Sequence, residues 1–325
     1  MKQVDFGPSE GRFESEMDPM AQPESQRSAP ATEQRNPRSL GLEGMSTLEL
    51  LTLLNEEDSA AIHAVAAALP ALSELVDEAV DRAREGGRVH YFGAGTSGRL
   101  GVLDAAELVP TFGTDPAQVQ AHIAGGSDAI VRAVEGSEDS ESDGRDAASR
   151  VVRSGDVVIG LTVSGTTPYV RGALAEARER GAVTGLVTSN PDSPLAPLAD
   201  HVIVADTGPE VLTGSTRLKA GTATKVILNG FSTALMVGLG RTYSNLMVAV
   251  VAGNQKLRER TLRILGDVAE TTPERTSQLL DAAGGDLRVA VVAAVAAVPA
   301  ESAAAALLES NGSVRDALRR LDADG

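Results

Sequence analysis

The chain has 325 residues, enough for one large domain or two smaller ones with a sizeable hydrophobic core. Its 29 Lys and Arg residues against 45 Asp and Glu residues give a formal net charge of −16, which argues against nucleic acid and anionic membrane surfaces as partners. The absence of Cys excludes disulfides, thiol nucleophiles and Cys-based metal sites, and it suits a cytoplasmic protein.

The N-terminal part of the chain is predicted to pass from a tail into helices. Residues 1–40 are rich in Glu, Ser, Pro, Gln and Arg with little apolar periodicity, so we expect a disordered tail without the apolar core of a signal peptide. Residues 46–49 fit a capping box, and the apolar spacing that follows predicts an amphipathic helix. A longer helix is expected up to Gly86-Gly87.

A unit of strand, polar loop and helix is predicted twice. A β-rich run at 88–92 leads into the glycine loop 93–98 and then into helical spacing, and an apolar strand at 156–163 leads into the loop 164–167 and a helix. Further strands are expected at 183–188 and 201–205. This alternation predicts an α/β fold, a parallel sheet sandwiched by helices, with ligands at the carboxyl ends of the strands.

The C-terminal part is predicted to be helical. A Gly, Ser and Thr-rich stretch from Thr213 precedes a long apolar helix, and the last seventy or so residues contain two related stretches, 279–288 and 307–315. We expect an α/β domain over 41–255 and a small helical domain over 256–325. The longest near-apolar run, 289–298, is too short to cross a bilayer, so no membrane span is expected.

The loop Gly93 to Gly98 matches G-x-G-x-x-G after a strand, a pattern that also occurs in dinucleotide sites. The next candidate strand, 118–124, ends in Gly125-Gly126-Ser127 and lacks the acid that would bind a ribose. Thr96 and Ser97 instead place hydroxyls where backbone amides can surround a single phosphate. A phosphate site without a nucleotide cofactor is therefore favoured over NAD.

A second hydroxyl-rich loop, Ser164-Gly165-Thr166-Thr167, follows the equivalent strand. Two such loops at neighbouring strand ends would face each other across one crevice and suit a phosphate monoester. The alternative for each loop alone is ordinary capping of the helix that follows it.

Two glutamates are candidates for acid–base chemistry. Glu107 lies between Ala105-Ala106 and an apolar run, a setting of the kind that raises the pKa of a carboxyl toward the range of a general acid. Glu138 lies in an acidic run that also fits a solvated turn. The four His residues have no metal-ligand spacing and are interpreted as structural.

The sequence from Phe92 to Glu107, FGAGTSGRLGVLDAAE, resembles the N-acetylmuramic acid 6-phosphate etherases, which have the sugar isomerase (SIS) fold. The resemblance covers roughly residues 32–260, and it extends to the helical tail. Its further segments are 123–126, 133–136, 168–170, 190–194 and 210–223.

The resemblance implies a reaction that needs no cofactor. The lactyl ether at C3 of the 6-phosphorylated amino sugar is eliminated and water is added, which gives N-acetylglucosamine 6-phosphate and (R)-lactate in cell-wall recycling. Glu107 aligns with the family's catalytic acid and Glu138 with its second catalytic glutamate. The resemblance also implies a homodimer whose site is completed across the subunit interface.

The residues that would hold the sugar phosphate are also implied by this resemblance and by similarity to the glucokinase regulatory protein. They are Thr96, Ser97, Ser164, Thr166, Thr167 and Lys256.

Three positions depart from the family pattern. Thr166 stands where Arg is usual, Leu108 where Cys is usual and Ala249 where Asp is usual. A non-catalytic sugar-phosphate sensor would need no glutamate pair, and a sugar-phosphate isomerase would not eliminate lactate. Because Glu107 and Glu138 are both present, the sequence favours an etherase over these two alternatives.

Overall fold

The computed structural model describes residues 30–249 and 255–323. Its centre is a parallel sheet of five strands in the order β2-β1-β3-β4-β5, which leaves β2 at one edge and β5 at the other. The strands are β1 (Val89–Gly93), β2 (Val119–Ile123), β3 (Val157–Leu161), β4 (Val183–Thr188) and β5 (His201–Val204). The expected parallel α/β sheet is confirmed, and the predicted strands match it to within a few residues.

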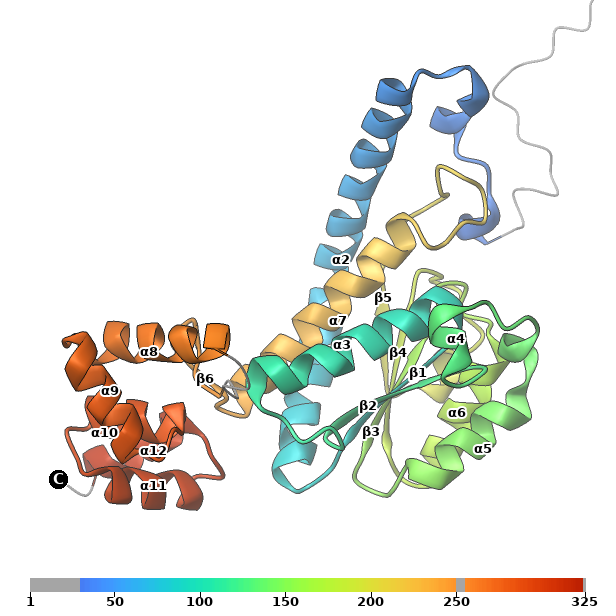
Figure 1. Ribbon diagram of the computed structural model, residues 1–325. Coiled ribbons are helices and arrows are strands. Elements are labelled where there is room, and N and C mark those ends of the chain that lie inside the picture. Colours follow the sequence, from blue (N-terminus) through green and yellow to red (C-terminus); the bar gives the residue numbers. More distant parts are fainter. Residues whose placement is uncertain (1–29, 250–254, 324–325) are drawn as a thin grey trace, which may run out of the picture.

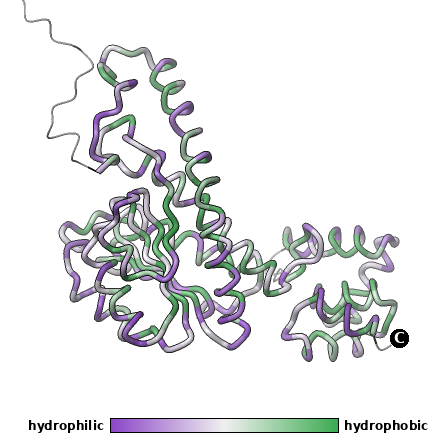
Figure 2. The backbone as a smooth tube through the Cα atoms, turned by 180° about the vertical axis from the view of Figure 1, so that it is seen from behind, coloured by the Kyte–Doolittle hydropathy of each residue, from purple (hydrophilic) through white to green (hydrophobic). Residues whose placement is uncertain are grey.

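Helices cover both faces of this sheet (Figure 1). One face carries a three-helix layer of α2 (Thr47–Arg84), α3 (Gly95–Phe112) and α7 (Lys219–Gly238), whose buried side chains share one core with the strands. The other face carries α5 (Glu141–Val151) and α6 (Pro168–Glu179), which enclose a second core. Figure 2 shows the hydrophobic residues along the central strands between these two layers.

Small residues allow these elements to approach closely. A Cβ on Gly144 of α5 would lie 1.9 Å from the carbonyl oxygen of Tyr169, and a Cβ on Gly172 of α6 would lie 2.0 Å from that of Glu141. Only glycine fits such contacts, so the backbones of α5 and α6 pack directly against each other. A chain with 2% aromatic residues fills its core by this close approach of elements.

The segment 30–45 is folded against the α/β domain, so the expectation of a disordered tail as far as residue 40 is wrong for residues 30–40. It forms three short 3₁₀ helices, η1 (Ala31–Glu33), η2 (Pro37–Ser39) and η3 (Leu42–Gly44), and it buries Thr32 and Asn36. Residues 1–29 of the predicted tail lie outside the described residues.

The predicted capping box is present at the start of α2, where Ser46 and Glu49 exchange hydrogen bonds with each other's backbone. The two helices expected before residue 86 are one continuous helix that contains Pro70. Among the described residues α2 is the one single helix long and apolar enough to cross a membrane, and a third of its most apolar 18-residue window is buried.

The C-terminal helices form a separate cluster beyond the C-terminal end of α3 (Figure 1). A short hairpin of β6 (Thr242–Tyr243) and β7 (Leu246–Met247) leads to it. Its helices are α8 (Gln255–Ala269), α9 (Pro273–Ala282), α10 (Leu287–Val295), α11 (Ala300–Glu309) and α12 (Val314–Ala323). The two related sequence stretches form the turn between α9 and α10 and the turn between α11 and α12.

Candidate functional site

A polar cavity of about 250 Å³ lies at the carboxyl ends of β1 and β3. Both hydroxyl-rich loops and one of the two predicted glutamates border it. The residues that line it are Glu33, Ala94, Gly95, Thr96, Ser97, Glu138, Leu161, Thr162, Val163, Ser164, Thr167, Gly214 and Thr216. The sequence prediction that the two loops face one crevice is in agreement with this arrangement.

Two helices begin at this cavity without a side-chain cap. The residue that precedes α3 is Ala94 and the residue that precedes α6 is Thr167, and neither side chain accepts a hydrogen bond from its helix. The N-terminus of α7 differs, because the buried carboxylate of Glu210 accepts hydrogen bonds from the backbone N–H groups of Lys219 and Ala220. The capping alternative therefore fails for both loops, and the open ends of α3 and α6 can accept an anion.

The loop after β3 is held in shape by its own hydroxyls. Thr162 Oγ1 lies 2.7 Å from Thr167 Oγ1 and accepts a hydrogen bond from the N–H of Gly165. Gly165 has a φ of 71°, and a Cβ there would lie 2.6 Å from the Ser193 side chain, so the position requires glycine. Asn190 donates to the carbonyl oxygen of Ser164 at 2.9 Å and fixes the loop from β4.

The glycine loop after β1 brings α3 close to the sheet. A Cβ on Gly98 would lie 2.7 Å from the carbonyl oxygen of Gly93 and 2.7 Å from Ile123 of β2, which explains the third glycine of the motif by packing. This contact leaves Ser97 8% exposed and turned toward the cavity that it lines. The motif therefore has a structural reason that needs no dinucleotide.

Glu138, one of the two candidate catalytic glutamates, lies in the cavity wall. It belongs to η4 (Ser137–Asp139), which follows Gly136 at a φ of 73°. Its side chain is exposed, because the cavity is open to solvent. Glu138 therefore lies in a solvated turn and also lines the cavity, so its two interpretations do not exclude each other.

Glu107 is not brought to this cavity within one chain. It lies ten residues after Ser97 on α3, about 15 Å along the axis at a rise of ~1.5 Å per residue. Its side chain is exposed on the outer face of the three-helix layer, next to Leu103, which is 51% exposed. The expected apolar setting is wrong, because sequence neighbours of Glu107 such as Leu108 point to the core side of the helix.

Of the remaining predicted ligands, Thr166 lies outside the cavity wall. Thr166 Oγ1 lies 3.0 Å from Ser164 Oγ on the exposed side of its loop, and Thr166 is absent from the lining residues. Lys256 is in the first turn of α8, among the C-terminal helices, and its side chain lies outside the described part of the chain. Of the family departures, Leu108 is buried in the main core and Ala249 is buried beyond β7.

Asp104 is a buried acid on α3 that sequence reasoning did not single out. It accepts hydrogen bonds from Tyr91 at 3.0 Å and from Ser232 at 2.9 Å, and so it links α3 to β1 and α7. Burial raises its pKa from 3.8 to about 6, although these two hydrogen bonds and the charge of Lys225 act in the opposite direction. Asp104 fixes α3 between the cavity and Glu107.

Sequence reasoning also missed Glu33, Gly214 and Thr216, which line the cavity. Glu33 precedes both hydroxyl loops in the chain, and Gly214 and Thr216 follow them. A signal was present for each of them. The family resemblance begins at residue 32, and it includes residues 210–223.

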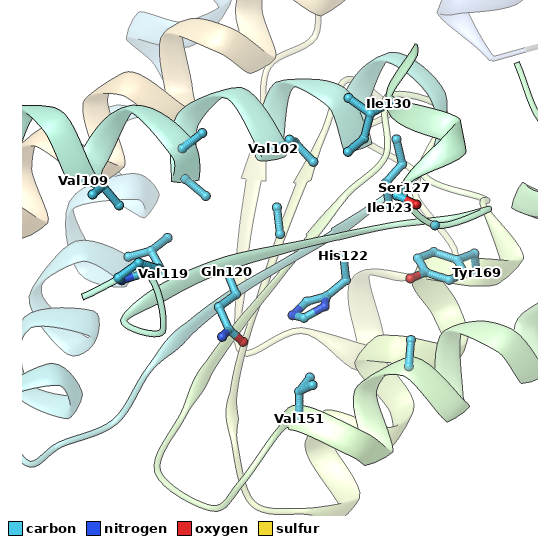
Figure 3. Close-up of a pocket in the computed structure, with 16 residues that line it drawn as sticks. Val102, Val109, Val119, Gln120, His122, Ile123, Ser127, Ile130, Val151 and Tyr169 are labelled. Carbon is cyan, nitrogen blue, oxygen red and sulfur yellow. The ribbon is translucent and has the colours of Figure 1, made fainter. Parts of the chain in front are cut away.

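A larger groove of about 750 Å³ lies beside the edge strand β2 (Figure 3). Its walls are mostly apolar side chains of α3 and β2, with Gln120, His122 and Tyr169 among them. Burial and the neighbouring His90 lower the pKa of His122 to about 4, so its ring is neutral at physiological pH. No group of three or more His, Asp or Glu side chains suited to a metal ion occurs among the described residues, in this groove or elsewhere.

Comparison with protein families identifies the same part of the chain. The glucokinase regulatory protein N-terminal SIS domain matches residues 71–178, and the SIS domain matches residues 132–231. These matches include both hydroxyl loops and Glu138, and the described sheet and helices have the SIS fold.

Curated relatives match over nearly the whole chain. A protein of a Synechococcus species is 49% identical over 302 residues, which is 93% of this chain and 96% of the relative. A protein of Thermobifida fusca is 54% identical over 80% of this chain and 86% of the relative, and one of Geobacillus thermodenitrificans is 48% identical over 89% and 98%. All three are named N-acetylmuramic acid 6-phosphate etherase.

Solved structures are more distant. A phosphoheptose isomerase from Francisella tularensis is 18% identical with a TM-score of 0.45, over 59% of this chain and 98% of the isomerase.

Proposed function

The chain belongs to the family of N-acetylmuramic acid 6-phosphate etherases, and we propose that the cavity at the ends of β1 and β3 is where it binds and cleaves its substrate. It is an enzyme that breaks a carbon–oxygen ether bond. One observation carries the location of the site. Two uncapped helix N-termini, their hydroxyls and Glu138 converge on one small polar cavity.

The phosphate of the substrate binds between the two loops. Its charge is met by the N-terminal amides of α3 and α6 and by the hydroxyls of Ser97, Ser164 and Thr167. Local dipoles must supply this attraction, because the net charge of −16 repels an anion at long range. Thr166 places a neutral side chain where relatives of this sequence pattern have a cation, so we expect weaker phosphate binding than with Arg at this position.

The reaction needs two proton-transfer groups. In the ring-opened sugar the C1 aldehyde acidifies the C2 proton, which a base removes while the C3–O bond breaks and an acid protonates the departing lactyl oxygen. Water then adds to C3 of the unsaturated aldehyde, and the ring closes as N-acetylglucosamine 6-phosphate beside (R)-lactate. We assign Glu138 as the base and Glu107 as the acid.

This assignment requires a second copy of the chain. Glu107 lies too far along α3 to reach a sugar held at the N-terminus of the same helix, so Glu107 of the partner subunit acts in each cavity. The outer faces of α2 and α3 support such a pairing, because they expose large apolar side chains. These are Leu48, Leu51, Ile62 and Leu69 of α2 and Leu103 of α3.

An apolar face of this kind is typical of a homodimer interface. The composition of α2 agrees with it, since the helix is apolar and yet only a third of its most apolar window is buried in a single chain. The predicted location in the cytoplasm and the exclusion of nucleic acid remain expectations from the sequence.

The test is lactate release from N-acetylmuramic acid 6-phosphate by the purified protein. We expect release by the wild type and a loss of about 100-fold or more in Glu107→Gln and in Glu138→Gln, because each change removes a proton-transfer group and keeps its shape. Glu135→Gln, an exposed acid three residues from Glu138, is the matched control and should keep wild-type turnover. A wild type that binds the sugar phosphate without releasing lactate would be a sensor.

A further inference from the structure

The cavity contains a second carboxylate besides Glu138. Glu33 of η1 lines it together with the hydroxyl loops, although it comes from a segment more than sixty residues before the first of them. Within the described residues its carboxylate makes no hydrogen bond and no ion pair, whereas its backbone N–H bonds to the carbonyl oxygen of Pro30. An exposed acid at the wall of a binding cavity, free of a protein partner, is available to a ligand.

A buried polar cluster fixes the segment that carries Glu33. Asn36 is 4% exposed and donates to Glu57 of α2 at 2.9 Å and to the carbonyl oxygen of Pro209 at 3.2 Å. Glu57 in turn accepts from the ammonium group of Lys219 at 2.6 Å, and Lys219 is 4% exposed at the start of α7. The cluster joins Asn36, three residues after Glu33, to Glu57 of α2 and through Glu57 to Lys219 of α7.

A buried cluster of this kind fixes the relative positions of the segments that it joins. A buried ion pair contributes little net stability, yet removal of one partner leaves the other charge buried and unpaired. Burial would raise the pKa of Glu57, but the hydrogen bond and charge of Lys219 with the bond from Asn36 lower it overall, so Glu57 stays ionised. The segment from Thr32 to Arg38 is therefore held in one position relative to the cavity.

The glycine opposite Glu33 supports the same conclusion. Gly214 has a φ of 75°, and a Cβ at this position would lie 3.2 Å from Glu33 Oε2. A side chain there would be strained and would press on the carboxylate. The absence of a side chain at Gly214 therefore leaves room for the Glu33 carboxylate next to the loop that carries Thr216.

We propose that Glu33 is a substrate-binding residue that accepts hydrogen bonds from the neutral O–H and N–H groups of the amino sugar. This inference rests on the proposed site. The carboxylate cannot face the phosphate or the lactyl carboxylate, because like charges repel. The ring hydroxyls and the acetamido N–H are the remaining donors, and a charged acceptor binds them more strongly than a neutral one.

The test separates binding from turnover. N-acetylglucosamine 6-phosphate, which carries the same donors and a further hydroxyl at C3 in place of the lactyl ether, is titrated calorimetrically into the wild type, Glu33→Ala and Glu33→Gln. We expect a dissociation constant about tenfold or more higher for Glu33→Ala and a smaller increase for Glu33→Gln, which keeps one acceptor oxygen. In the lactate assay Glu33→Ala should raise KM more than it lowers kcat.

Glu43→Gln is the matched control, since Glu43 is an exposed acid of the same N-terminal segment outside the cavity, and its affinity should equal that of the wild type. Equal dissociation constants for Glu33→Ala and the wild type would overturn the proposal. A wild type that binds the sugar phosphate but releases no lactate would reject the etherase site alone, because the affinities would still decide the role of Glu33. A wild type with no affinity at millimolar sugar phosphate would reject both.

Discussion

Glu138 and Glu107 are held by two very different regions of the molecule. Glu138 lies in a polar cavity where five segments of one chain meet, and the topology of the parallel sheet brings together the two loops that follow β1 and β3. Glu107 lies exposed on an outer helix face near Leu103, outside this cavity. The first region is formed by the fold of one chain, and in the proposed dimer the second region completes the site of the partner subunit.

This difference shows why the predicted pair cannot be judged from one chain. Ligands bind at the carboxyl ends of parallel strands, and that rule locates the phosphate loops. It does not locate a residue on the fourth turn of α3, whose surroundings depend on what covers the three-helix layer. The following predictions test the two regions separately.

The largest effect is expected in the cavity. Glu138→Gln should lower turnover by about 100-fold to 10,000-fold, because it removes the base that takes the C2 proton. Its affinity for N-acetylglucosamine 6-phosphate should change little. A kcat close to that of the wild type, measured by lactate release, would reject the assignment of Glu138.

A charge on the outer face should have the next largest effect. Leu69→Glu places a carboxylate at a side chain that is 51% exposed in one chain and buried in the proposed dimer. We expect dissociation in sedimentation velocity experiments and a loss of lactate release that follows it. Leu308→Glu on α11 is the control, since Leu308 is 81% exposed outside the three-helix layer. A monomeric variant with full activity would contradict the shared site.

The buried acid Asp104, which fixes α3 between the two regions, makes the stability of the fold depend on pH. The folded protein keeps Asp104 protonated between pH ~4 and its pKa of about 6, whereas the unfolded chain releases the proton near its ordinary value of 3.8. Folding therefore takes up a proton in this window, and the free energy of unfolding falls as the pH rises through it.

Asp104→Asn removes this pH dependence. The difference in the free energy of unfolding between wild type and variant should shrink by about 2 kcal/mol from pH 4 to pH 7, as measured by urea denaturation. The difference isolates Asp104 from other groups such as His122, whose pKa is lowered to about 4 by burial and by His90. A difference that does not vary with pH would show that Asp104 is ionised throughout.

The smallest effect is expected from a single phosphate hydroxyl. Ser97→Ala should weaken the binding of N-acetylglucosamine 6-phosphate by about tenfold, since it removes one hydrogen bond to a charged group. Ser149→Ala on α5, outside the cavity, should bind as the wild type does. Unchanged affinity of Ser97→Ala would place the phosphate elsewhere.

Much of the fold was predictable because its signals are local. Pro168 at the first helical position, the apolar run of β3 and the glycine loop after β1 each depend on residues close in sequence, and each was predicted near its observed position. The segment 30–40 was mispredicted for the opposite reason. Asn36 fixes it through partners 21 and 173 residues away, and no composition or periodicity reports such contacts.

The site was predictable in part. Ser97, Ser164 and Thr167 converge because strand ends converge, which the alternation of strands and helices implies, whereas Glu138 was singled out by the family resemblance. The apolar neighbours of Glu107 in sequence suggested burial, but successive helical residues point in directions ~100° apart, so neighbours along the chain do not share a face. Exposure of Glu107 could be known only from the packing of α3.

Subunit complementation decides whether one cavity uses Glu138 of its own chain and Glu107 of the partner subunit. Glu107→Gln and Glu138→Gln chains, each inactive alone, are unfolded, mixed in equal amounts and refolded together. Random pairing makes half of the dimers mixed, with one intact site in two, so about a quarter of wild-type lactate release should return. No recovery, with mixed dimers confirmed by an affinity tag on one of the two chains, would show that both glutamates act from one chain and would contradict the shared site.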